Sequence, residues 1–227
     1  MNALSPIRLT LIFLLAYGAL LASLFLPAGR LDWWQGWGYF ALLALTTGAS
    51  SIVLLRRDPE LIRRRFTVGE GTSVADRVIA QVIKMTFLGA YVLGALDGGR
   101  FGWSRMPEWL WPVGALLHLV GYGIVHFSML ANTHFESTVR IQRDRDHRVI
   151  DTGPYAVVRH PGYSGFLLLM AAVPLLLGSG WAAVPLAVGA AVLVFRIHRE
   201  ERLLRMELPG YANYMEKVRH RLVPGVW

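Results

Sequence analysis

The chain alternates between long apolar blocks and short polar segments. The apolar blocks predict six membrane-spanning helices, at residues 7–27, 34–55, 80–98, 109–131, 163–178 and 181–198. An apolar run of about 20 residues is long enough to cross a bilayer as a helix. The last two blocks are joined by the turn residues Gly178-Ser179-Gly180 and form a tight hairpin. Because some blocks are short, five crossings are the alternative to six. The pattern predicts an all-α integral membrane protein.

Composition and charge agree with this class. The chain has 227 residues, of which 54% are hydrophobic and 17% charged, and it has no cysteine, which excludes disulfides and thiolate metal sites. The net charge of +8 could indicate nucleic acid, but its distribution argues for a membrane orientation signal. Of the 23 basic residues, the loops on one side hold only Arg30, Arg100 and Arg105, while the opposite side holds the others, residues 63–65 among them. Since positive loops stay cytoplasmic, both termini and both long polar loops are expected there, next to anionic lipid headgroups.

A polar turn runs directly into the hairpin, from Gly153 to Gly165. Within it, Pro161 restricts the backbone of His160 and can open the next helix, whose free N–H groups would then face the turn. The rings of His160 and Tyr163 offer flat surfaces for stacking on a base. These features predict a ligand-binding turn. The alternative is that Arg159 is one more cytoplasmic positive charge and that Pro161 merely starts a helix.

A second polar cluster lies where the hairpin ends, at Arg196, Arg199, Glu200 and Glu201. Fork-shaped cations and acidic acceptors at both feet of one hairpin suit a zwitterionic ligand, whereas a pyrophosphate would not favour two carboxylates. The alternative is that the carboxylates only offset repulsion, for instance between Glu201 and Arg205. Together the two clusters predict a cytoplasmic pocket for a cofactor that carries an amino acid.

The remaining polar residues give weaker indications. Residues 132–151 contain histidines and carboxylates, but no metal-ligand spacing, so solvated loop charge is expected and no metal. Asn132 and His134 are close enough to the membrane edge to reach the pocket. His118 and His126, eight residues apart on one helix face, are expected to be buried and hydrogen-bonded. There is no dinucleotide-binding glycine fingerprint and no serine triad.

Four motifs, in this order, resemble the isoprenylcysteine carboxyl methyltransferase (ICMT) family, which is related to phospholipid methyltransferases. They are Thr152-Gly153-Pro154-Tyr155, Arg159-His160-Pro161-x-Tyr163-x-Gly165, Glu200-Glu201-x-x-Leu204 and Tyr211-x-x-Tyr214. The preceding segment Ser137-Thr138-Val139-Arg140-Ile141-Gln142 resembles the bacterial branch of this family. The resemblance covers about the last 100 residues. One departure is Leu208-Pro209-Gly210, where the family often has Phe-Gly and an acidic residue.

The resemblance implies an S-adenosylmethionine-dependent methyltransferase of the bacterial inner membrane. It implies a single transmembrane domain, 1–227, in which helices within 1–108 precede a methyltransferase core at 109–227 with an amphipathic tail. The cofactor-binding candidates by motif match are Tyr155, Arg159, His160, Pro161, Tyr163, Gly165, Glu200 and Glu201. Arg196, with Arg199 as a substitute, is the catalytic candidate that positions a carboxylate acceptor. An isoprenoid or prenylcysteine carboxylate is favoured as acceptor, and a small thiol or a phospholipid amine stays open.

Two other classes of protein compete with this interpretation. Membrane reductases that use NADPH on sterol or isoprenoid double bonds carry a similar Arg-His-Pro-x-Tyr turn, although they usually have more helices. A transporter or a scaffold is the third class. A transporter should show broken helices and polar groups at mid-membrane, whereas the polar residues here gather at one edge.

Overall fold

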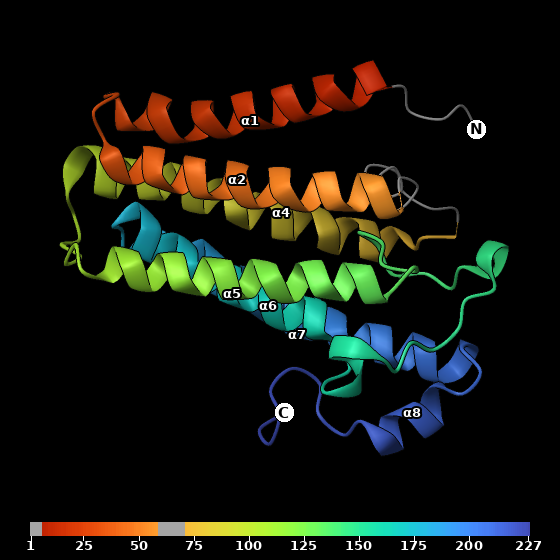
Figure 1. Cartoon of the computed structure of the whole chain (residues 1–227). Helices are drawn as coiled ribbons and strands as arrows, with labels where there is room; N and C mark the ends of the chain where they lie inside the picture. The colour runs from red at the N-terminus through yellow and green to blue at the C-terminus, as the bar shows by residue number, and fades with distance from the viewer. Residues whose placement is uncertain (1–5, 59–70) are drawn as a thin grey trace.

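Among the residues that the structure describes, six long helices run side by side and account for the apolar blocks of the sequence (Figure 1). The computed structural model describes residues 6–58 and 71–227, and within these ranges it contains no strand. The elements in chain order are α1 (Pro6–Ala28), α2 (Trp34–Arg57), α4 (Val74–Gly94), η1 (Ala95–Phe101), α5 (Leu110–Ala131), η2 (Arg143–Arg145), η3 (Gly153–Ala156), α6 (Pro161–Leu177), α7 (Ala183–Glu207) and α8 (Tyr211–Lys217).

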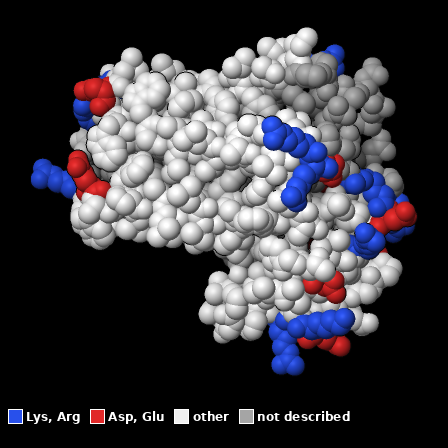
Figure 2. All heavy atoms as spheres, in the orientation of Figure 1, with Lys and Arg blue, Asp and Glu red and all other residues white. Residues whose placement is uncertain are grey.

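The surface of this bundle is that of an integral membrane protein, as the hydropathy pattern predicts. Four helical stretches are long and apolar enough to cross a membrane: Thr10–Ala28, Trp34–Arg57, Val74–Phe101 and Leu110–Ala131. Helix α6 is apolar but has only 17 residues. Large apolar side chains that water would drive inside are exposed along the helices. Figure 2 shows an uncharged band across the body, with Lys, Arg, Asp and Glu gathered toward its ends.

One end of the bundle, which we call the aromatic end, consists of the loops at residues 29–33, 102–109 and 178–182. Seven of the eight tryptophans lie in these loops or within a turn of them, as in the aromatic belts of membrane proteins. They are Trp33, Trp34, Trp37, Trp103, Trp109, Trp111 and Trp181. Buried Asp97 ties two of the loops together, because it accepts hydrogen bonds from the hydroxyls of Ser104 and Ser179.

The helix boundaries differ from the sequence prediction at two places. Helix α4 begins at Val74 rather than near residue 80, because Ser73 caps it by accepting a hydrogen bond from the Asp76 amide at 3.1 Å, and it continues as a π-helix to Phe101. Helix α7 continues to Glu207, nine residues beyond the predicted end, because its last turns remain amphipathic and bury Leu204. Residues 63–65, counted above with the cytoplasmic charges, lie outside the described residues.

The two histidines of α5 bond to α2, as predicted. His118 is buried, and its Nε2 lies 3.1 Å from the hydroxyl of Thr46. The Nδ1 of His126 lies 2.6 Å from the hydroxyl of Ser50. Such hydrogen bonds hold helices together inside a membrane, where lipid offers no polar partner.

Helices α5 and α6 approach closely because glycines face each other between them. A Cβ atom at Gly165 would run into the carbonyl oxygen of Gly121 and lie 3.0 Å from the amide nitrogen of Val125. Close approach through small residues is the usual way in which membrane helices pack. Gly165 therefore fixes the position of α6, which carries the polar turn at its start.

We expect Gly165→Ala to destabilise the protein by roughly 1–3 kcal/mol, since the added methyl group overpacks the contact between α5 and α6. Thermal unfolding in detergent would show a lower midpoint. Gly123→Ala on α5 is the matched control, because a Cβ there meets nothing within 4 Å. If both variants melted like the wild type, the packing role of Gly165 would be wrong.

Candidate functional site

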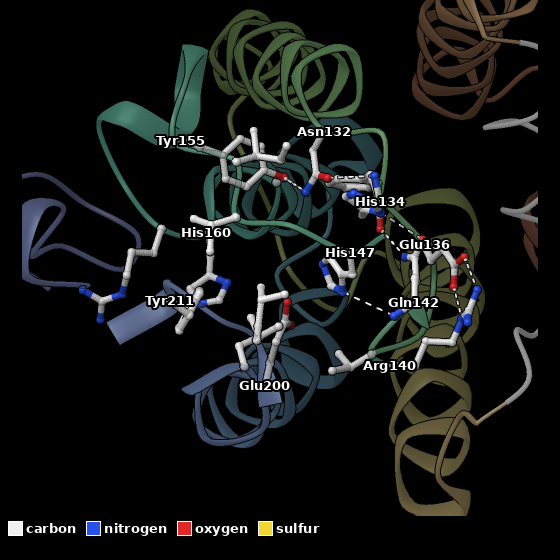
Figure 3. A pocket seen from close by; sticks show the side chains of 18 of the residues that line it. Asn132, His134, Glu136, Arg140, Gln142, His147, Tyr155, His160, Glu200 and Tyr211 are labelled. Carbon is white, nitrogen blue, oxygen red and sulfur yellow. Dashed lines mark hydrogen bonds and ion pairs between the residues drawn. The ribbon is translucent and has the colours of Figure 1, made fainter. Parts of the chain in front are cut away.

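A pocket opens at the end of the bundle opposite the aromatic end, which we call the pocket end (Figure 3). Its walls come from the segment 132–160, which follows α5, and from the start of α6, the end of α7 and α8. Polar and aromatic side chains line it, among them Asn132, Gln142, Tyr155, His160, Glu200 and Tyr211. The pocket thus joins the two feet of the α6–α7 hairpin, as the sequence predicts.

The wall nearest the helices consists of Tyr163, Arg196 and Glu200. The Tyr163 hydroxyl donates to the Glu200 carboxylate at 2.6 Å, and the Arg196 guanidinium carbon lies 5.9 Å from the centre of the Tyr163 ring. Arg196 is buried and donates through Nη2 to the carbonyl oxygen of Ser137 at 2.8 Å, with Asp76 at 3.3 Å. Its Nε is buried and finds no hydrogen-bond partner among the described residues. Arg196 is therefore held rigidly at the pocket with one donor unused.

Glu201 lies behind the pocket wall, in a buried ionic cluster. Its Oε1 accepts a hydrogen bond from Arg159 Nε at 2.7 Å and lies 3.2 Å from His160 Nε2. Its Oε2 accepts from Arg221 Nε at 2.8 Å. Burial alone would raise the pKa of Glu201, but the hydrogen bonds from these three residues outweigh burial and hold the pKa well below its usual range. The carboxylate is ionised at neutral pH and can only accept, so His160 Nε2 carries a hydrogen.

The loop at residues 132–151 is only partly solvated. The prediction of solvated charge holds for Arg143, Asp146 and Arg148, which are exposed, and is wrong for Glu136 and Arg140. Glu136 and Arg140 form a bidentate pair at 2.8 and 2.9 Å with 5% and 8% of their side chains exposed. Gln142 is buried and donates to the carbonyl oxygen of His134 at 2.7 Å. Burial first, then the charges of His134 and Arg140, lower the pKa of His147 to about 4, so its ring is neutral at pH 7. No metal-binding group of His, Asp and Glu occurs in residues 6–58 and 71–227.

Three tyrosines close the far side of the pocket. Tyr155 accepts a hydrogen bond from the Asn132 amide at 3.1 Å, and the Tyr214 hydroxyl donates to the carbonyl oxygen of Tyr155 at 2.7 Å. Burial raises the pKa of Tyr155, Tyr211 and Tyr214 above the ordinary value, so all three stay protonated. The Tyr211 hydroxyl is buried without a protein partner among the described residues, and so it is available to a ligand.

The structure brings most of the candidate residues together at the pocket but separates others. Those that line it are Tyr155, Arg159, His160, Tyr163, Arg196 and Glu200. Arg199 does not: it is exposed and lies over the Phe195 ring. Successive residues of a helix point about 100° apart, which explains why Arg199 and Glu201 diverge from Arg196 and Glu200. Pro161 is buried at the start of α6, and Gly165 packs on α5, so neither lines the pocket.

Several lining residues were not among the sequence candidates. Gln142, His147, Arg140 and Tyr211 belong to this group, while Asn132 and His134 reach the pocket as predicted. The only sequence signal for Tyr211 is its spacing from Tyr214, which forms the last of the four motifs. For the others, the sequence carries no signal beyond polarity within the segment that precedes the Gly153–Gly165 turn.

Comparisons with known proteins agree with this arrangement. Residues 115–206 match the family model described as the isoprenylcysteine carboxyl methyltransferase (ICMT) family. The match covers less than half of the chain, so it shows a similarity of this segment to the family. The segment begins within α5 and ends in the last turn of α7, so it contains most of the elements that form the pocket.

Two plant proteins are similar to part of the chain in sequence. A probable protein-S-isoprenylcysteine O-methyltransferase of Oryza sativa subsp. indica is 32% identical over 114 residues, which cover 47% of this chain and 57% of the rice protein. Protein-S-isoprenylcysteine O-methyltransferase B of Arabidopsis thaliana is 30% identical over 90 residues, or 39% of this chain and 46% of the relative. The chain thus spans about half the length of these relatives.

The fold extends further than the sequence similarity. The solved structure of a eukaryotic intramembrane Ras methyltransferase, ICMT, superposes with a TM-score of 0.53 at 17% identity, covering 98% of this chain and 87% of that one. At this identity the likeness concerns the fold alone, and it includes α1, α2 and α4. These comparisons give no support to the NADPH-dependent reductase.

Proposed function

We propose that the chain is a membrane methyltransferase that binds S-adenosylmethionine in this pocket and methylates an acceptor delivered from the bilayer. The observation that carries the proposal is the set of unlike polar groups that meet at one pocket. They are the carboxylate of Glu200, the cation of Arg196 and the Tyr211 hydroxyl, which finds no partner among the described residues. The domain division expected from the sequence follows: one transmembrane unit, 1–227, with its methyltransferase core in 109–227.

The donor set fits this cofactor. Glu200 is an acceptor for an ammonium group, and Asn132 and Tyr211 can bond hydroxyl or ring nitrogen atoms. The rings of His160 and Tyr163 are stacked, with their centres 5.6 Å apart and 20° between their planes, and they provide a flat surface next to these polar groups. Two hydrogen-bonding atoms of the pocket, Tyr211 Oη and Arg196 Nε, are buried without a partner in the described part of the chain, which favours a ligand that bonds them.

The residues of the chain would contribute binding, orientation and exclusion of water. When bound, the cofactor supplies a methyl group on a positively charged sulfur, and in-line transfer from it depends mainly on proximity and alignment. Arg196, fixed by Ser137 and Asp76, would orient a carboxylate acceptor without needing a base. The buried Glu136–Arg140 segment would cover the pocket on its water side.

The acceptor and the orientation follow from the same arrangement. An isoprenoid or prenylcysteine-type carboxylate fits a pocket with a cation at the membrane edge, since its chain could stay in hydrocarbon. The excess of basic residues at the pocket end supports an orientation with that end, and both termini, in the cytoplasm. We assign the protein to a bacterial inner membrane on the resemblance to the bacterial branch.

Calorimetry on the purified protein tests the cofactor. We expect S-adenosylhomocysteine, the demethylated product, to bind and NADPH not to bind. Incubation with methyl-labelled S-adenosylmethionine and either a synthetic S-farnesyl cysteine or a membrane lipid extract, followed by mass spectrometry, then identifies the acceptor. Binding of NADPH without S-adenosylhomocysteine would refute the methyltransferase function.

A further inference from the structure

The last residues of the chain are fastened to the back of the Arg159–His160 turn. The Arg159 amide donates to the carbonyl oxygen of His220 at 2.9 Å, and the His160 amide donates to that of Arg221, also at 2.9 Å. The Arg159 side chain adds two bonds from Nη1, to the carbonyl oxygens of Val218 at 2.8 Å and Arg219 at 2.7 Å. Ser164 Oγ donates to the carbonyl oxygen of Leu222 at 2.7 Å. The turn is therefore held along its length by residues 218–222, which we call the tail clamp.

Side chains join the tail clamp to the pocket through Glu201. Arg221 comes from the clamp and Arg159 from the turn, and both donate to the Glu201 carboxylate, one on each oxygen. The same carboxylate is the partner of His160 Nε2. Glu201 is buried and does not line the pocket, whereas His160 does. A ligand in the pocket thus meets His160 and Arg159, and it is connected to Glu201 only through these two residues.

We propose that Glu201, Arg159 and Arg221 are positioning residues that set the His160 ring, and that the tail clamp is a structural part of the cofactor pocket. The assignment replaces the sequence expectation that Glu201 binds the cofactor itself, and it gives Arg159, which also lines the pocket, a positioning role. This proposal rests on the proposed function in one respect, which is that the pocket binds the cofactor.

Arg221 is needed to hold Glu201 in place because the Glu201 carboxylate is charged and buried. A buried carboxylate needs its hydrogen bonds filled, and Arg221 supplies the one on Oε2. Without Arg221, Glu201 would lose this partner and its position between Arg159 and His160 would be less well defined. The guanidinium of Arg221 also lies 5.3 Å from the centre of the Trp227 ring, which holds the arginine from the other side.

The test compares Arg221→Gln with Arg219→Gln. The Arg219 side chain is exposed and contributes only its carbonyl oxygen to the clamp, so this neighbour is a matched control. Two quantities are measured on the full chain in detergent: affinity for S-adenosylhomocysteine, and hydrogen exchange of the peptide that contains the amides of Arg159 and His160. We expect Arg221→Gln to weaken binding about tenfold and to speed exchange, with Arg221→Lys partly restoring both. Arg219→Gln should leave both unchanged.

The results distinguish a failure of the positioning role from a failure of the proposed function. Unchanged affinity in Arg221→Gln overturns the positioning role, whether or not exchange is faster. Weaker binding with unchanged exchange also overturns it, because Arg221 would then act on the ligand rather than through the turn. If the wild type does not bind S-adenosylhomocysteine, the proposed function fails, while the exchange experiment still decides whether Arg221 holds the turn.

Discussion

Replacing Arg196 with Gln should lower kcat/KM for a carboxylate acceptor by about 10²- to 10³-fold, the usual loss when one fixed donor to a reacting oxygen is removed. Arg196 is buried at the pocket wall and fixed by Ser137 and Asp76, and its Nε has no hydrogen-bond partner among residues 6–58 and 71–227. Methyl transfer from labelled S-adenosylmethionine to a synthetic S-farnesyl cysteine is the measurement. Affinity for S-adenosylhomocysteine should change far less, since the missing cation serves the acceptor.

The matched control for this experiment is Arg199→Gln. Arg199 lies on the same helix with the same charge, but it is exposed and does not line the pocket. Arg196→Lys keeps a cation beside Asp76 and separates loss of fold from loss of activity. Full activity of Arg196→Gln would show that Arg196 does not position the acceptor. An equal loss in Arg199→Gln would make the effect one of surface charge.

Glu200→Gln should weaken the binding of S-adenosylhomocysteine by about 10- to 100-fold, the range expected for a charge-assisted hydrogen bond to an ammonium group. Glu200 lines the pocket, and its Oε2 accepts from the Tyr163 hydroxyl at 2.6 Å, which leaves the other oxygen for the ligand. Calorimetry measures the change. Tyr163→Phe, which removes only the internal bond, should cost less.

Glu207→Gln is the control for Glu200→Gln. It removes a carboxylate two turns along α7 whose partner, Arg143, has 79% of its side chain exposed. An exposed pair of this kind contributes little. Binding by Glu200→Gln equal to that of the wild type would exclude Glu200 from the cofactor site. Equal losses in both variants would point to the charge of α7 as a whole.

The sequence predicts the helices well because hydrocarbon demands long apolar runs, and such runs are visible without an alignment. It also places the polar turn and the Glu200 region at the same end of one hairpin. The sequence does not tell which of two adjacent polar residues on a helix points into the pocket. Glu200 and Glu201 look alike in sequence, yet one lines the pocket and the other is locked to Arg159, His160 and Arg221.

Contacts between distant segments explain the rest. The burial of Glu136 and Arg140 depends on how segment 132–162 folds against α5 and α7, and no local pattern marks it. The tail clamp joins residues about 60 positions apart through backbone groups, which every residue possesses. Hydrogen bonds between backbone groups do not depend on residue type, so they cannot be predicted from the sequence.

The uneven placement of tryptophan means that the intrinsic fluorescence of the protein can report on each end of the bundle separately. Seven indole rings lie at the aromatic end, and the eighth, Trp227, lies at the pocket end with its ring 5.6 Å from that of His198. Most of the intrinsic fluorescence therefore originates on one side of the bilayer. A quencher confined to the inside or outside of a vesicle would read the orientation of the chain, while Trp227 alone would sense events near the pocket.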